Sequence, residues 1–184
     1  LLARLRADNP DQNLSPKQIE FARTIYSAGS DLLALIDDIL DLSKIEAGRM
    51  DVEPMELRLA EVRGYVEQAF RPQAEEKGLR LSVRVSPELA GSIVTDAQRL
   101  QQILRNLLSN AFKFTEEGEG ALEIAPADPP YAVAMTGRDT GIGIPQDKLR
   151  LIFEAFQQAD GTTSRRYGGT GLGLSISREI ARLL

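Results

Sequence analysis

The sequence predicts an α+β protein, in which a two-layer α/β sandwich follows one long helix. Within residues 15–50, apolar residues recur at the spacing of a helix. Over residues 56–184, short apolar runs of strand length interleave with longer helical stretches, which is typical of helices packed on a sheet. We therefore expect one domain over residues 1–50 and a second over residues 56–184.

The composition fits a packed domain and excludes several classes of site. Hydrophobic residues make up 42% of the 184 residues and charged residues 27%, so disorder is not expected. The net charge is −5 with no basic block, which argues against nucleic acid as a partner. Without Cys or His, the chain has no disulfides, thiolate sites or histidine ligands. No signal peptide or apolar run of roughly 20 residues is present, as a secreted or membrane-spanning segment would need.

The first domain is expected to be a helical hairpin whose second helix is long. Residues 1–10 fit the last turns of a helix, and Ser15 with Gln18 forms a capping box that starts the next one. Gly48 is expected to end it. A coiled-coil-like seam favours partner helices, although a single helix lying on its own domain is an alternative. The seam consists of Ile25, Gly29, Leu32, Ile36 and Ile39.

The second domain is expected to alternate helices with strands. Gly78 should close its first helix and Asp96 should cap its second. Helices are predicted over 55–78, 95–115, 146–156 and 170–184, and strands over 79–86, 121–125 and 131–135.

Three polar side chains share one stripe of the helix predicted over residues 95–115. Asn106, Asn110 and Lys113 are spaced by one helical turn each, opposite a leucine-rich face. Two amides and an ammonium can hold phosphate oxygens and a metal ion, and Mg²⁺ accepts a single Asn carbonyl when phosphates and water complete its shell. On these residues alone, a solvated polar face is the better interpretation.

Two glycine-rich stretches would let a ligand come close to the backbone, a flat group with an amine at the first and an anion at the second. In "RDTGIGIP", Asp139 follows a strand and could accept a hydrogen bond from an exocyclic amine such as that of adenine, although the same residues fit a plain turn. In "RRYGGTGLGLSIS", glycines precede an apolar helix without the Gly-Lys-Ser/Thr of a P-loop or the spacing of a dinucleotide fingerprint. Bare amides at a helix start attract anions, whereas a flexible linker would not lead directly into an apolar helix.

Together and in this order, these stretches resemble the catalytic ATP-binding domain of histidine kinases, which shares its fold with gyrase, Hsp90 and MutL. "NLLSNAFKFT" resembles the asparagine box, "DTGIGIP" the first glycine box, "FEAF" the phenylalanine box and "GGTGLGL" the second glycine box. "DILDLSKIEAG" is similar to the second helix of the dimerisation and histidine-phosphotransfer hairpin. The resemblance implies a sandwich of the histidine-kinase ATPase type and a homodimer of the parent protein through a helical bundle. It also implies a cytoplasmic domain, and it is compatible with a membrane anchor elsewhere in the parent protein.

The resemblance assigns roles to individual residues. Asn106 and Lys113 would be catalytic, and Asn110 would bind Mg²⁺. Asp139 would bind the adenine amino group. Phe153 and Phe156 would anchor a lid over residues 157–168, in which Arg165 or Arg166 could reach the γ-phosphate. The implied ATP-binding residues are Asn110, Lys113, Asp139, Gly141, Gly143, Phe153, Phe156, Arg165, Arg166, Gly169, Thr170, Gly171, Leu172 and Gly173.

One position favours a kinase over a hydrolase. The ATPase relatives place a Glu one turn before the metal-binding Asn, where this chain has Asn106, and a neutral amide is no general base. Transfer from Mg-ATP to a histidine, and onward to a response-regulator aspartate, needs mainly positioning and charge neutralisation. A hydrolase of the same fold and a non-catalytic ATP-binding module are the alternatives.

Two parts of the family pattern are missing from the chain. It contains no His, so we expect the phosphoacceptor box just upstream of Leu1 and no autophosphorylation of this chain by itself. A degenerate protein that has lost this histidine is the alternative. A final strand of the sheet is also expected to follow residue 184, and Gly137 should weaken the strand before the first glycine box.

Overall fold

The computed structural model describes residues 2–9, 13–157 and 170–184. The chain divides into two compact units, Leu1–Gly48 and Arg49–Leu184. None of the described helices combines the length and the apolar character that crossing a membrane would require.

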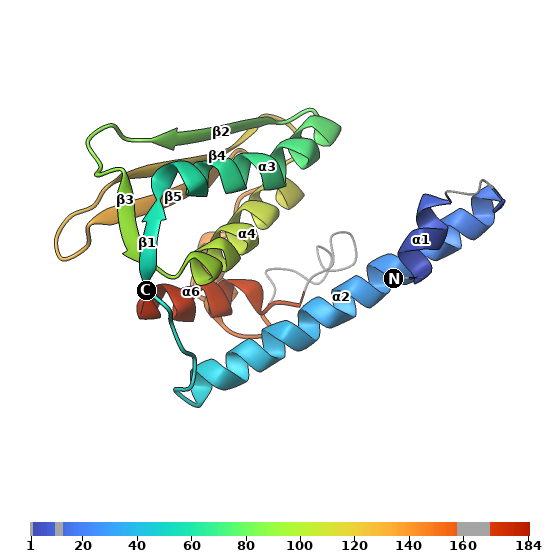
Figure 1. Cartoon of the computed structure of the whole chain (residues 1–184), viewed down its shortest axis with the longest axis horizontal. Coiled ribbons are helices and arrows are strands. Elements are labelled where there is room, and N and C mark those ends of the chain that lie inside the picture. The colour runs from blue at the N-terminus through green and yellow to red at the C-terminus, as the bar shows by residue number, and fades with distance from the viewer. Residues whose placement is uncertain (1, 10–12, 158–169) are drawn as a thin grey trace. The chain divides into compact units, whose positions relative to one another are not determined.

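The first unit pairs a short helix with a long one (Figure 1). Helix α1 spans Leu2–Asp8 and helix α2 spans Pro16–Glu46. The predicted capping box is confirmed, because the Ser15 hydroxyl accepts from the Gln18 N–H and the Gln18 side chain accepts from the Ser15 N–H. Gly48, with a φ of 62°, follows the end of α2.

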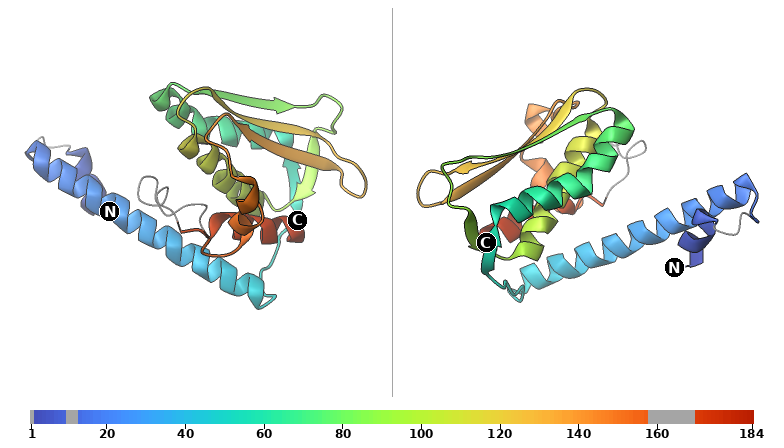
Figure 2. Two further views of the ribbon diagram at one scale, coloured as in Figure 1. Left: turned by 180° about the vertical axis from the view of Figure 1, so that it is seen from behind. Right: turned by 45° about the horizontal axis from the view of Figure 1, so that its top comes forward.

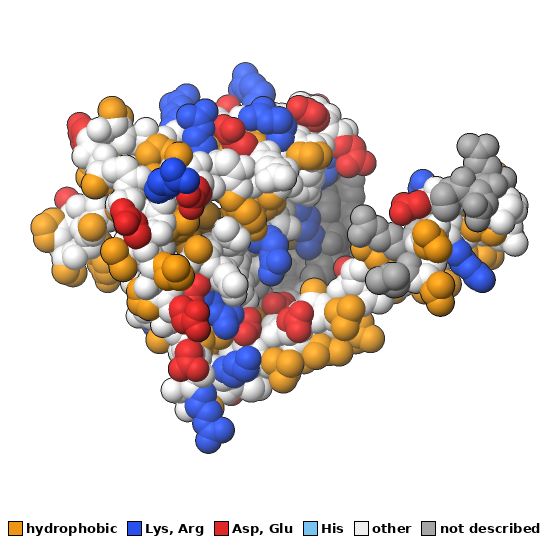
Figure 3. Space-filling view, viewed as in Figure 1, with side chains coloured by type: hydrophobic (Ala, Val, Ile, Leu, Met, Phe, Trp, Pro, Cys, Tyr) orange, Lys and Arg blue, Asp and Glu red, His pale blue; other side chains and the backbone are white. Residues whose placement is uncertain are grey.

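The apolar seam of α2 lies open on the surface of this unit. Ile25 is 65% exposed, Leu32 57% and Ile36 44%, and Figure 3 shows hydrophobic side chains gathered along one side of the helix. Ala22 is the only buried residue of α2.

The second unit contains the remaining elements (Figure 1). They are β1 (Met55–Arg58), α3 (Leu59–Lys77), β2 (Arg80–Val85), β3 (Ser92–Thr95), α4 (Ala97–Phe114), β4 (Glu119–Pro126), β5 (Val133–Asp139), the 3₁₀ turns η1 (Gln146–Lys148) and η2 (Leu151–Phe153), and α6 (Gly173–Leu183).

The strands form a mixed sheet and a separate antiparallel pair (Figure 2). In the sheet, β4 is central: β2 runs parallel to it with Arg80 opposite Glu119, and β5 runs antiparallel with Asp139 opposite Gly120. Strands β1 and β3 pair with each other, which places Leu57 opposite Ile93.

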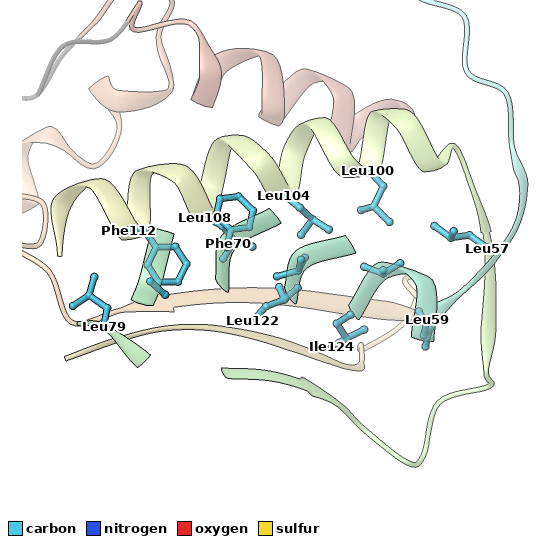
Figure 4. Packing of buried hydrophobic residues seen from close by; sticks show 13 residues of the cluster. Leu57, Leu59, Phe70, Leu79, Leu100, Leu104, Leu108, Phe112, Leu122 and Ile124 are labelled. Carbon is cyan, nitrogen blue, oxygen red and sulfur yellow. The ribbon is translucent and has the colours of Figure 1, made fainter. Parts of the chain in front are cut away.

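One hydrophobic core joins α3 and α4 to the sheet (Figure 4). Both helices contribute side chains to this core. The rings of Phe70 from α3 and Phe112 from α4 stack with their centroids 5.8 Å apart. Helix α6 runs along the side of α4 that faces away from the sheet (Figure 4). The fully enclosed core side chains include Val66, Leu104, Leu108, Phe112, Leu122 and Ile124. The α+β sandwich predicted from the sequence is confirmed.

Three local predictions differ from the structure. Residues 55–58 form strand β1 rather than the first turn of a helix, because their backbone pairs antiparallel with β3, with Leu57 opposite Ile93. Strand β3 was not predicted, since four residues give too short a pattern. The helix predicted over 146–156 is two single 3₁₀ turns, as so short a segment has little cooperative stability of its own.

Candidate functional site

Helix α4 carries the polar stripe that the sequence suggested. Asp96 caps its start, accepting from the N–H groups of Gln98 and Arg99 at 2.9 and 3.0 Å. Its leucine face lies in the core, which leaves Asn106, Asn110 and Lys113 half-buried on the other side. The helix therefore presents the three side chains together, at successive turns.

Asn106 connects α4 to the start of α6. Its Nδ2 donates to the Gly173 carbonyl oxygen at 3.1 Å and to Ser177 Oγ at 3.2 Å. A carbonyl oxygen only accepts, so the nitrogen of the amide must be the atom facing α6. A Cβ added to Gly173 would lie 3.3 Å from Asn106 Cγ, which means that the glycine lets the amide approach α6 closely.

Asn110 has the features expected of a magnesium ligand. Its side chain is half-buried, and its amide forms no hydrogen bond with another described residue. Its carbonyl oxygen is a suitable hard ligand for Mg²⁺. The described residues include no cluster of three or more acidic, His or Cys side chains that could hold a metal. An Mg²⁺ bound through Asn110 would therefore take its other ligands from phosphate oxygens and water.

Lys113 lies one turn further along the same stripe. Burial lowers the pKa of its ammonium group, because desolvation disfavours the charged form. Its Nζ lies 5.2 Å from the centroid of the Phe114 ring, a cation–π distance. A partly desolvated ammonium interacts strongly with an anion such as a phosphate.

The first glycine stretch is docked on the last carbonyl of α4. The Ile142 N–H donates to the Phe114 carbonyl oxygen at 3.2 Å, and the Gly141 N–H donates to Asp139 Oδ1 at 2.9 Å. A Cβ on Gly141 would lie only 2.6 Å from the Phe114 oxygen, so this position requires glycine. Asp139 itself is exposed, and Gly143 adopts a φ of 69°. Residues of β5, the turn and α4 therefore meet at one end of α4.

The segments that flank residues 158–169 meet at their ends. The Phe156 N–H donates to the Gly171 carbonyl oxygen at 3.1 Å. Gly171 has a φ of 71°, and a Cβ there would lie 3.1 Å from the Gln157 carbonyl oxygen. Phe153 is half-buried in η2, beside α6, whereas Phe156 is 63% exposed. Of the predicted site residues, Arg165, Arg166 and Gly169 lie outside the described residues.

The start of α6 is anchored by a buried leucine. The Leu172 side chain is fully buried, so any contact of Leu172 with a ligand would come from its backbone. Its N–H donates to Thr170 Oγ1 at 3.2 Å, and its carbonyl oxygen accepts from Ser175 Oγ at 2.8 Å. The half-buried Gly173 follows as the first residue of the helix.

Sequence reasoning missed two residues that support this site. Lys77, at the end of α3, donates from Nζ to the carbonyl oxygens of Phe112 and Lys113 at 2.7 and 3.3 Å. A lysine just before Gly78 signals the end of its own helix, and nothing in the sequence ties it to α4. Sequence reasoning also missed the contact of Ser177 with Asn106, because a serine inside an apolar helix belongs to no recognisable motif.

Comparison with known proteins identifies the family of this fold. Residues 95–184 match the family described as histidine kinase-, DNA gyrase B-, and HSP90-like ATPase. The chain is 40% identical, over 93% of its length, to the autoinducer 2 sensor kinase/phosphatase LuxQ of Vibrio cholerae, and spans 20% of that protein.

Solved structures agree with the sequence relatives. Full-length ShkA, in complex with AMPPNP, is similar with a TM-score of 0.78 and 31% identity, over 98% of this chain and 36% of that one. The histidine kinase ThkA, in complex with the response regulator TrrA, shares the fold with a TM-score of 0.61 and 24% identity, over 97% of this chain and 47% of that one. With its four motifs in order on this fold, the chain belongs to the sensor histidine kinases of two-component systems and contains their catalytic ATP-binding core.

Proposed function

We propose that this chain binds Mg-ATP beside α4 and transfers the γ-phosphoryl group to a histidine supplied from outside its 184 residues. The observation that carries the proposal is the convergence at α4. Asn106 is hydrogen-bonded to the start of α6, and the Phe114 carbonyl holds the 139–143 turn. Two motifs far from α4 in sequence thereby contact the helix that carries the polar stripe.

Each side chain has a role in binding the nucleotide. The Asn110 carbonyl oxygen holds Mg²⁺, which neutralises phosphate charge when bound. The Lys113 ammonium pairs with phosphate oxygens. The Asp139 carboxylate accepts from the adenine amino group, with Gly141 and Gly143 shaping that end. Phe153 and Phe156 flank the phosphate end of the site, where Gly171 and Gly173 present backbone amides.

The transfer step needs a nucleophile but no water-activating base. The bond between the γ-phosphorus and the ADP oxygen breaks, and a bond forms between phosphorus and an imidazole nitrogen. Asn106 occupies the position of the general base in the hydrolases, and its amide nitrogen is already committed to α6. Positioning and charge neutralisation are then the chief contributions of this chain.

The phosphoryl group then passes to a receiver-domain aspartate of a response regulator, with cleavage of the phosphorus–nitrogen bond and formation of an acyl phosphate. Residues 1–50 act as part of the dimerisation and phosphotransfer hairpin, and residues 56–184 as the catalytic domain. The exposed seam of α2, including Ile25 and Leu32, supports pairing with helices of a second subunit.

Transfer of labelled γ-phosphate tests the proposal. The chain is mixed with an upstream-extended version that contains the expected histidine helix and carries Asn110→Ala, so that only the first protein binds ATP. We expect acid-labile, base-stable label on the extended protein, dependent on Mg²⁺ and lost when Asn110→Ala is also placed in the short chain. Release of inorganic phosphate without label would indicate a hydrolase, and no ATP binding by the unmodified chain would refute the site.

A further inference from the structure

The Asn106 amide donates hydrogen bonds to two acceptors that lie one helical turn apart on α6. Gly173 and Ser177 are separated by four residues, so they share one face of α6. The Gly173 carbonyl oxygen and Ser177 Oγ lie 3.1 and 3.2 Å from the same Nδ2, and an amide NH₂ group has two hydrogens to donate. Ser177 is only 3% exposed, so no bulk water replaces its hydroxyl.

These two hydrogen bonds determine which way the Asn106 carbonyl oxygen points. An amide is planar, so fixing Nδ2 against α6 also fixes the direction of Oδ1. A Cβ on Gly173 would lie 3.5 Å from both Nδ2 and Oδ1, which shows the amide lying flat over the glycine. One acceptor alone would leave the amide free to turn about its Cβ–Cγ bond, whereas two hold it.

We propose that Ser177 is a positioning residue of the nucleotide site, which holds the Asn106 carbonyl oxygen as an acceptor beside Asn110. The inference rests on the proposed function, because it gives Asn106 a role at the metal and phosphate end of the ligand. Its ligand is the hydrated Mg²⁺ of the bound nucleotide, whose water molecules donate to an oxygen and not to an NH₂ group. Ser177 therefore acts through Asn106 and does not touch the nucleotide.

A neighbouring serine provides the matched control. Ser175 lies on the same helix, is 4% exposed, and donates its hydroxyl to the Leu172 carbonyl oxygen at 2.8 Å. It makes no hydrogen bond to Asn106. Replacing Ser175 by Ala thus removes an equally buried hydroxyl from α6 while leaving both hydrogen bonds of the Asn106 amide intact.

The test measures AMPPNP binding to the whole chain by calorimetry, with Mg²⁺ and with EDTA. We expect Ser177→Ala to weaken binding in Mg²⁺ about three- to tenfold, the effect of one buried hydrogen bond, and to leave binding in EDTA unchanged. Ser175→Ala should change neither value by more than about twofold. Ser177→Cys, nearly isosteric with a poor acceptor, should weaken Mg²⁺-dependent binding in the same direction and serves if the alanine variant does not fold.

A double-mutant cycle separates positioning from general destabilisation. In an Asn106→Ala background, Ser177→Ala should have no further effect on binding, because the group it positions is gone. An equal loss in both backgrounds would overturn the inference, as would equal losses for Ser175→Ala and Ser177→Ala or unchanged binding by both Ser177 variants. Failure of the unmodified chain to bind AMPPNP would refute the proposed function and this inference together.

Discussion

The Lys77 ammonium donates to the Phe112 carbonyl oxygen at 2.7 Å, although the two residues are 35 positions apart. The last carbonyl oxygens of α4 accept hydrogen bonds from three different residues. Thr115 Oγ1 donates to Ala111 and the Ile142 N–H donates to Phe114, while Lys77 serves the two carbonyls between them. A helix end otherwise leaves these acceptors unpaired, and a positive charge there also complements the helix dipole.

We expect Lys77→Met to lower the free energy of unfolding by about 1–2 kcal/mol, because two carbonyls of α4 lose a charged donor. Urea denaturation followed by circular dichroism measures this change. Lys77→Arg retains a cation and should recover at least half of the loss. Equal stability of the methionine variant and the unmodified chain would show that the contact is not formed in solution.

Gly141→Ala should destabilise the domain by about 1–3 kcal/mol, because a methyl group cannot fit 2.6 Å from the Phe114 carbonyl oxygen. Gly137→Ala is the control, since a Cβ at that position meets no atom within 4 Å. Thermal denaturation of the two variants should therefore separate them clearly. Similar melting temperatures would mean that the turn is not held against α4.

Asn110→Ala should weaken Mg²⁺-dependent ATP binding at least about tenfold, because the ion loses its protein ligand. Arg105→Ala is a suitable control, as Arg105 is exposed on the same helix. Titration calorimetry with and without Mg²⁺ distinguishes loss of the metal from loss of the nucleotide. If Asn110→Ala weakened binding equally in EDTA, the residue would contact the nucleotide rather than the ion.

Asp96 should make the domain sensitive to acid. Burial alone raises the pKa of its carboxyl group, but hydrogen bonds from the N–H groups of Glu53, Arg99 and Gln98, with the Arg99 charge, lower the pKa below its ordinary value of 3.8. The unfolded chain then binds the proton more readily than the folded one. The stabilisation is complete above the ordinary pKa and is lost as pH falls through the lower folded value.

Asp96→Asn tests this linkage, because asparagine keeps a good helix cap without the charge. The stability of this variant, measured by urea denaturation, should fall less steeply than that of the unmodified chain as pH is lowered below about 4. Parallel pH profiles for the two proteins would assign the acid sensitivity to other carboxylates.

The exposed seam of α2 predicts association through this helix. Ile36→Glu places a charge among apolar side chains that a partner helix would bury, and it should shift the chain toward the monomer in sedimentation equilibrium. Lys44→Gln, on the exposed surface of the last turn of α2, changes the net charge by the same one unit and is the control. A monomer at all concentrations for the unmodified chain would contradict pairing through α2.

The sequence by itself determined the capping box of α2, the amphipathic face of α4 and the order of the glycine stretches. These features are local: they depend on the period of apolar residues and on residue types at helix ends, which neighbours in sequence decide. Even so, four-residue strands such as β1 and β3 were too short for their pattern to be distinguished from a helix or a loop.

Only the tertiary structure decided which distant groups meet. Three contacts join segments that are tens of residues apart or that flank residues 158–169. They are Lys77 with the carbonyls of α4, Ser177 with the amide of Asn106, and the Phe156 N–H with the Gly171 carbonyl oxygen. No periodicity encodes such pairs. They form because folding brings unpaired donors and acceptors together, and polar groups withdrawn from water need a partner.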